Sequence, residues 1–216
     1  MTGVKGTQRA YRSAAREEAA HRTRETVIAA AAEVFAEKAY AGATIELIAA
    51  SAGVSRATVF GVGGKAQLFA LARMHAATGG RLTANDEGFE RLLATPDAHR
   101  LLKEFAAFTA AISRRLGPLQ LALEQAATTD PELAQLQESS QRELLECARA
   151  IAQAVAATGS LRRDVSPKVA ADILWLQIQP TNYRRLTQER GWSHEAFERW
   201  HAATMIAGLL NHHPAD

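Results

Sequence analysis

The sequence predicts an all-α protein with a small N-terminal three-helix domain and a larger C-terminal helical bundle. Alanine is abundant and β-branched runs are rare, a composition that favours helices over strands. Hydrophobic residues make up 47% of the 216 residues, which is enough for a sizeable core. Apolar residues recur at helical spacing along successive segments, and clusters of Gly and Pro separate these segments.

The first 22 residues are expected to form a basic, flexible arm, part of which can be helical. Before Glu25 the chain has six Lys and Arg residues against two Glu residues, a net charge of +4, whereas the whole chain carries only +2. Two interpretations stay open: the arm follows the phosphates of a nucleic acid, or it is a solvated tail. The first well-defined helix is expected over residues 23–38.

Residues 44–65, TIELIAASAGVSRATVFGVGGK, predict two short helices joined by a tight turn. Thr44 and Ser55 are suited to cap the two helices, because a hydroxyl oxygen accepts a hydrogen bond from a free backbone N–H. Gly53 supplies the backbone geometry that ends the first helix. This is the pattern of a helix-turn-helix, whose second helix enters the DNA major groove. An ordinary helical hairpin is the alternative.

Downstream of this segment a helix is expected over residues 65–78, and Gly79 and Gly80 end it. Further helices are expected near residues 86–93, 97–116, 118–127, 132–157, 167–179 and 193–210. Gly117 and Pro118 are expected to interrupt one helix and start the next. The chain is thus divided into an arm (1–22), a helix-turn-helix domain (23–72) and a ligand-binding and dimerisation domain (73–212).

Taken together, these motifs resemble the TetR family of transcriptional regulators. The resemblance is carried by TVIAAAAEVFAEKAY at residues 26–40, by residues 44–60 and by Lys65 and Leu68. Weaker similarities lie at residues 159–172 and at RGWS, residues 190–193. The resemblance implies a homodimeric repressor that binds a palindromic operator in double-stranded DNA and is released by a small-molecule effector.

On this basis, the second helix of the motif and its flanks are expected to bind DNA. Arg56 is the candidate for reading a guanine edge, with a phosphate contact as the alternative. Thr44 and Lys65 are expected to meet phosphates. The expected DNA-binding residues are Thr44, Ser55, Arg56, Ala57, Thr58, Phe60 and Lys65.

The resemblance also implies an effector cavity and a dimer surface in the larger domain. A pocket needs apolar walls and a few polar groups. The candidates are Phe105, Phe108, Thr109, Ile112, Leu123, Trp175 and Gln179, and plain core packing is the alternative for the apolar ones. The helices near residues 167–179 and 193–210, which contain the three tryptophans, are the expected dimer surface.

The chain departs from the family pattern at three positions. Alanine stands at 39, where the family usually has Gly, and would cost about 1 kcal/mol if that site is left-handed. Val62 and Gly63 stand where an aromatic phosphate contact and a buried Phe are usual. These departures motivate the alternative of a ligand-binding or scaffolding protein whose head no longer binds DNA.

Nothing in the sequence predicts an enzyme, a metal site or a cofactor. The seven histidines show no metal-binding spacing. Cys147, the single cysteine, has no visible catalytic partner. The absence of an apolar run long enough to span a bilayer, and of disulfide-forming cysteines, leads us to expect a cytoplasmic protein without a membrane partner.

Overall fold

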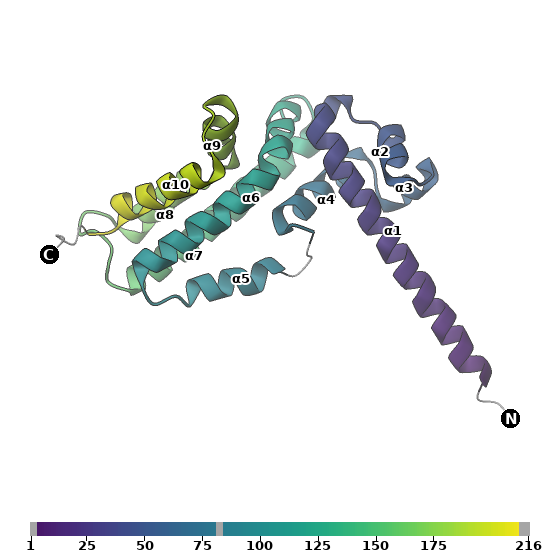
Figure 1. The fold of residues 1–216 in the computed structure, drawn as a ribbon, viewed down its shortest axis with the longest axis horizontal. Coiled ribbons are helices and arrows are strands. Elements are labelled where there is room, and N and C mark those ends of the chain that lie inside the picture. The colour runs from purple at the N-terminus through teal and green to yellow at the C-terminus, as the bar shows by residue number, and fades with distance from the viewer. Residues whose placement is uncertain (1–3, 81–83, 212–216) are drawn as a thin grey trace. The chain divides into compact units, whose positions relative to one another are not determined.

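A computed structural model describes the backbone of residues 4–80 and 84–211, and the side chains of 15–80 and 87–211. Over these residues the fold is all-α: helices make up nearly the whole chain, and the β-type pairing is confined to an isolated bridge between Leu161 and Leu210. The chain divides into two compact units, Met1–Ala72 and Arg73–Asp216 (Figure 1).

The first unit contains α1 (Val4–Gly42), α2 (Ile45–Ala52), α3 (Arg56–Val62) and the first half of α4 (Lys65–Thr78). Its core forms because each helix presents one apolar stripe. The Phe35 and Phe69 rings meet edge to face, with centroids 4.9 Å apart. The buried core residues are Val27, Ile28, Ala31, Phe35, Ile48, Val59, Leu68 and Phe69.

Helix α1 is longer than the sequence led us to expect. Residues 4–22, expected as a flexible arm, are helical and continuous with the rest of α1. The helix also passes residue 38, the expected end, and is broken at Ala39, which has φ 55° and ψ 179°. This is not the left-handed helical geometry considered for Ala39 but an extended conformation at positive φ that is almost confined to glycine.

The second unit is a bundle of longer helices. It contains α5 (Ala84–Leu93), α6 (Ala98–Ala126), α7 (Pro131–Ala157), α8 (Pro167–Gln177), α9 (Pro180–Arg184), a π-helix (Arg185–Glu189) and α10 (His194–Leu209). Asp97, Asp130, Ser166 and Ser193 cap α6, α7, α8 and α10 through their side-chain oxygens. The central core residues include Leu101, Leu102, Phe105, Ile151, Val155, Leu174, Met205 and Leu209.

The expectation of two helices separated at Gly117 and Pro118 was wrong, because α6 runs through both residues. Proline lacks the N–H that would bond the preceding turn, at a cost of about 3 kcal/mol in a helix interior. The buried residues before and after it, Leu116, Leu119 and Leu123, lie on one apolar face. Their packing holds the two halves of α6 in one continuous helix.

Candidate nucleic-acid interface

Two capped helices form the centre of the candidate site. The Thr44 hydroxyl accepts a hydrogen bond from Leu47 N at 3.2 Å, and the Ser55 hydroxyl accepts one from Thr58 N at 3.1 Å. Gly53, between the helices, is left-handed with φ 66° and ψ 31°. The backbone therefore turns sharply from α2 into α3, as a helix-turn-helix requires.

Helix α3 has one buried face and one exposed face. Val59 is fully buried in the core of the first unit. Arg56, Ala57 and Phe60 are exposed on the other face, and 56% of Phe60 is accessible to solvent. A large aromatic side chain that is exposed to this extent on a seven-residue helix contributes little to the packing of the core.

Arg56 forms an ion pair with Glu46 that the sequence analysis did not find. Its Nη2 lies 2.8 Å from Glu46 Oε1, and both side chains are more than half exposed. Backbone and Thr44 hydrogen bonds, with the Arg56 charge, lower the pKa of Glu46. The carboxylate therefore orients Arg56 and offsets its charge in the DNA-free protein.

The remaining expected DNA-binding residues lie at the edges of the same surface. Thr58 is partly buried and its hydroxyl lies 2.9 Å from that of Ser55. Lys65 is partly buried and its Nζ lies 4.5 Å from the centre of the Tyr40 ring, a cation–π arrangement. The structure thus brings together on one helical hairpin and its flanks the residues that the sequence singled out.

The turn between α3 and α4 is well packed although residues 62 and 63 are not aromatic. Gly63 is buried in an extended conformation, and its N–H donates to Val59 O at 3.2 Å. A Cβ at this position would lie 2.5 Å from Gln67 Oε1. The side chain of Gln67 therefore covers the glycine.

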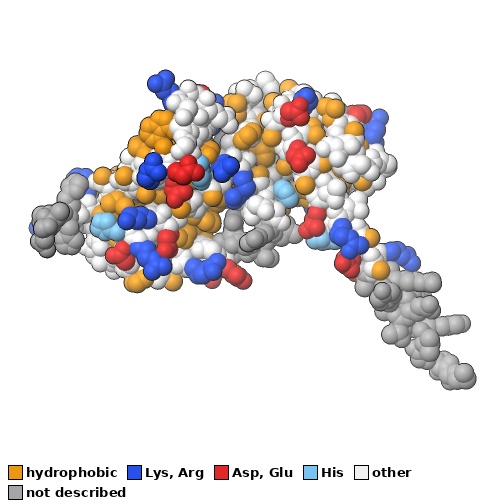
Figure 2. Space-filling model, viewed as in Figure 1, with side chains coloured by type: hydrophobic (Ala, Val, Ile, Leu, Met, Phe, Trp, Pro, Cys, Tyr) orange, Lys and Arg blue, Asp and Glu red, His pale blue; other side chains and the backbone are white. Residues whose placement is uncertain are grey.

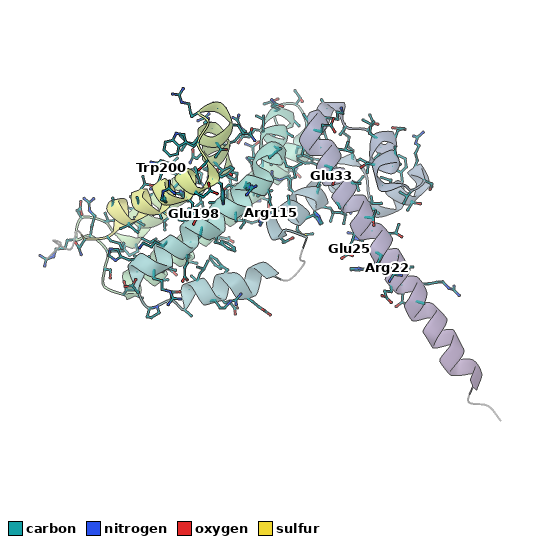
Figure 3. The ribbon with its side chains drawn as sticks, in the orientation of Figure 1. Arg22, Glu25, Glu33, Arg115, Glu198 and Trp200 are labelled. Carbon is teal, nitrogen blue, oxygen red and sulfur yellow. The ribbon has the colours of Figure 1, made fainter. Side chains whose placement is uncertain are left out.

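The C-terminal end of helix α4 is hydrogen-bonded to α6 within the second unit. Arg115 of α6 donates from Nε to Ala76 O at 2.7 Å and from Nη2 to Ala77 O at 2.9 Å. Figure 3 labels Arg115, whose cation faces the negative end of the α4 dipole. One turn earlier on α4, Arg73 is buried, and its Nη1 has no hydrogen-bond partner among the described residues.

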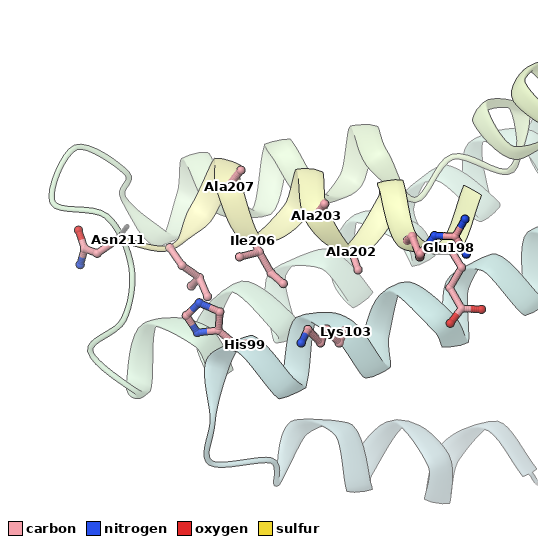
Figure 4. A pocket seen from close by; sticks show the side chains of 10 residues that line it. His99, Lys103, Glu198, Ala202, Ala203, Ile206, Ala207 and Asn211 are labelled. Atoms are coloured by element: carbon pink, nitrogen blue, oxygen red, sulfur yellow. The ribbon is translucent and has the colours of Figure 1, made fainter. Parts of the chain in front are cut away.

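The cavities lined by described residues of the second unit include a larger and a smaller open one. The larger, about 610 Å³, is lined by residues of α6 and α10, including His99, Lys103 and Ile206 (Figure 4). The other, about 520 Å³, lies between the C-terminal half of α6 and the N-terminal half of α7, and includes Glu124 and Gln141.

Neither cavity is lined by the residues expected to bind an effector. Phe105 and Leu123 are fully buried, and Thr109 is buried against His201. The other four are partly buried: Phe108, Ile112, Trp175 and Gln179. Gln179 is bonded to Gln141, which borders the smaller cavity, in two hydrogen bonds of 3.0 and 3.1 Å.

His201 is the most deeply buried histidine among the described residues, at 1% exposure. Its Nε2 lies 3.1 Å from the Thr109 hydroxyl, which itself donates to the Phe105 and Ala106 carbonyls. The hydroxyl therefore accepts from Nε2–H, and Nδ1 has no hydrogen-bond partner in the part of the chain that the structure describes. Burial lowers the pKa of His201 to about 4, so this imidazole is neutral at pH 7.

Helices α8 and α10 carry exposed hydrophobic side chains. The large ones are Val169, Leu176 and Trp200, and Trp192 is exposed in the segment just before α10. Leu176 is 62% exposed, and the Trp192 and Trp200 rings meet edge to face at 5.9 Å. Figure 2 shows hydrophobic side chains between charged ones over this part of the second unit.

Within the described residues, no group of three or more His, Cys, Asp or Glu is arranged to hold a metal ion. No single helix in that part of the chain is long and apolar enough to cross a membrane, although the bent pair α2 and α3 passes by length and composition.

Comparisons with known proteins agree with this geometry. The family model described as bacterial regulatory proteins, tetR family, matches residues 27–71. No curated protein sequence matches the chain.

Solved structures match over most of the chain. NalD, the secondary repressor of the MexAB-OprM multidrug efflux pump in Pseudomonas aeruginosa, has 23% identity and a TM-score of 0.67, covering 90% of this chain and 98% of NalD. SmeT, the repressor of the Stenotrophomonas maltophilia pump SmeDEF, was solved with triclosan and has 19% identity and a TM-score of 0.69, covering 88% and 92%. FadR from Bacillus subtilis, bound to stearoyl-CoA, has 18% identity and a TM-score of 0.68, covering 85% and 97%.

The likeness to these structures establishes the fold over most of the chain. The match at residues 27–71 covers the segment from the buried part of α1 to the first half of α4, including both capped helices. The protein therefore has the fold of these proteins, and the segment of its first unit with both capped helices is similar to the family model described as bacterial regulatory proteins, tetR family.

Proposed function

We propose that this protein is a sequence-specific DNA-binding transcriptional regulator, a homodimeric repressor that a small-molecule effector releases from a palindromic operator. The observation that carries the proposal is the pair α2 and α3. Both helices are capped by hydroxyl side chains, the turn passes through left-handed Gly53, and α3 leaves Arg56 and Phe60 exposed. These are the parts that a recognition helix needs in order to enter a major groove.

The Glu46–Arg56 pair supports base reading by Arg56. An arginine whose charge is offset by a carboxylate gains less binding energy from contact with a phosphate. Its remaining N–H groups can still donate hydrogen bonds to the O6 and N7 acceptors of a guanine. Phe60, on the same exposed face, is suited to contact a thymine methyl group or the sugar backbone.

The exposed faces of α8 and α10 support a homodimer. Val169 and Leu176 on α8, with Trp200 on α10, leave apolar area in solvent that a second copy would cover. A dimer also fits the need for two half-sites, since a single helix-turn-helix buries too little surface for specific binding at physiological salt.

Effector control is proposed to act through α4. This helix has its first residues in the core of the first unit and its last turn bonded to Arg115 of the second. An effector that binds one arrangement of the second unit more tightly would bias the position of α4, and only one position would fit the operator. We propose that the effector binds beside the partly buried residues Phe108, Ile112, Trp175 and Gln179.

Selection of bound sequences from a random duplex pool tests the proposal. Enrichment of a palindrome supports a dimeric sequence-specific regulator, and binding to it should weaken steeply with salt. No enrichment would favour the alternative, a ligand-binding protein whose head does not recognise DNA. Arg56→Ala should weaken the binding of the selected operator by about 1–3 kcal/mol and relax the base preference at one position of the palindrome.

Arg24→Ala is a matched control for Arg56→Ala. Arg24 is an exposed arginine of the same unit that lies outside α2 and α3. Its loss removes the same charge from the same unit without touching the recognition helix. A loss in Arg56→Ala that is the same on the operator and on random duplex, with Arg24→Ala unchanged, would make Arg56 a phosphate contact rather than a base reader.

A further inference from the structure

The helix-turn-helix domain itself carries no net positive charge. Residues 23–72 contain four Lys and Arg residues and four Glu residues. Two of the cations, Lys38 and Arg56, are ion-paired with Glu37 and Glu46, both at 2.8 Å or less. Since phosphate neutralisation supplies most non-specific affinity for DNA, the cations must come from elsewhere.

The N-terminal part of α1 has the missing charge. Residues 1–22 contain five Lys and Arg residues against two Glu residues, a net charge of +3. The backbone is helical from Val4 onward and continues without interruption into the buried part of α1 (Figure 1). The first buried side chain along the described part of α1 is Val27.

The basic residues of this segment follow the helical repeat. Lys5, Arg9, Arg12 and Arg16 are separated by four, three and four residues. At 100° per residue, these positions fall within an arc of about 60° on one face of the helix. Glu17 and Glu18 fall more than about 100° away from the middle of this arc.

The described side chains near this stripe are free of the core. Arg16 and Arg22 are exposed, and the ion pairs of this part of α1 are local, such as Arg22 with Glu18 at 2.8 Å. Figure 3 shows Arg22 and Glu25 projecting from α1. All described side chains from residue 15 to residue 22 are exposed, so core packing of this described part gives no reason for a row of cations.

We propose that the N-terminal extension of α1, through the stripe Lys5, Arg9, Arg12 and Arg16, binds the phosphate backbone of DNA beside the operator. This inference rests on the proposed function and assigns the salt-dependent affinity to the extension, while the sequence is read by α3. Four cations on one face span about 16 Å of helix, a length that reaches along several successive phosphates.

The test measures the salt dependence of DNA binding by the full-length protein. The stripe variant carries Lys5→Gln, Arg9→Gln, Arg12→Gln and Arg16→Gln, because glutamine keeps a high helix propensity. The control variant carries Arg91→Gln, Lys103→Gln, Arg149→Gln and Arg163→Gln, all at exposed positions of the second unit outside the proposed dimer surface. Both variants lose the same four charges. Circular dichroism confirms that each stays folded.

The probes are the selected operator and a random duplex of the same length, titrated between 50 and 200 mM salt. Each phosphate contact contributes about 0.9 to the slope of log K against log[salt]. Loss of four contacts should therefore lower the slope by about 3.6 per protomer on both probes, with the selected sequence unchanged. The control variant should keep the wild-type slope.

Three results would overturn the inference: a stripe-variant slope within one unit of wild type, an equal fall in the control variant, or a changed consensus sequence. The proposed function is judged separately, by whether the wild-type protein selects a sequence at all. If it selects none, the slope on the random duplex still decides whether the stripe binds phosphates.

Discussion

Replacement of Ala39 by glycine is expected to stabilise the protein. Ala39 has φ 55° and ψ 179°, and it is the single non-glycine residue with positive φ among the described residues. This region costs a residue with a Cβ about 1–3 kcal/mol. Glycine removes that cost but makes the unfolded chain more flexible, which offsets about 0.5–1 kcal/mol. The net expected gain for Ala39→Gly is about 1 kcal/mol.

Ala41→Gly is the matched control for this prediction. Ala41 is exposed, lies two residues further along α1, and is helical, so the same chemical change should destabilise by about 0.5–1 kcal/mol. The two substitutions therefore differ in the expected sign of their effect.

Urea unfolding followed by far-UV circular dichroism is the suitable assay. The three tryptophans, Trp175, Trp192 and Trp200, all lie in the second unit, so their fluorescence reports the other part of the chain. A shift to higher urea in the dichroism transition, with fluorescence unchanged, is expected for Ala39→Gly. Equal destabilisation by both substitutions would refute the assignment of strain to Ala39.

Three more predictions concern the ion pair, the buried histidine and the apolar face. Glu46→Gln should free Arg56 from its ion pair, which should raise the affinity for random duplex several-fold and relax the base preference at one operator position. Gel-shift titration with operator and random duplex measures both effects. A higher affinity without any loss of base preference would contradict the prediction. His201 has a folded pKa of about 4, below its unfolded value near 6.5, so the unfolded state takes up the proton first and stability falls as the pH drops from 6.5 to 4. The free energy of unfolding of the wild type should fall by up to about 3 kcal/mol across that range because of this group alone. Urea titrations at each pH should show a smaller fall for His201→Gln. Parallel pH profiles of the two proteins would exclude His201 as the cause. Leu176→Glu should dissociate the proposed dimer in sedimentation velocity, with Gln188→Glu, an exposed change outside α8 and α10, as the control. A monomeric wild type would refute the dimer, and an intact Leu176→Glu dimer would place its interface elsewhere.

The helix starts were predictable because capping is local. Thr44 and Ser55 cap the helices that follow them through their own hydroxyls, within three residues along the chain. The same applies to Ser166 and Ser193. Gly53 was predictable for the same reason, since the positive φ is a property of one residue.

Features that depend on contacts distant in sequence were not predictable. Pro118 has the local signature of a helix break, yet packing on both sides of it keeps α6 continuous. The Thr109–His201 hydrogen bond joins residues 92 apart in sequence. The Glu46–Arg56 pair is only ten residues apart, but it depends on the angle between α2 and α3, which spacing alone does not give.

The attachment of α4 to Arg115 has a mechanical consequence. A helix of 14 residues is about 21 Å long and does not stretch. If its last turn is held at Ala76 and Ala77, the Lys65 end lies about 17 Å away, and a tilt of about 10° displaces that end by roughly 3 Å, close to one base-pair step. A shift of α6 that tilts α4 at Arg115 would therefore be larger at the Lys65 end of the helix than at its last turn.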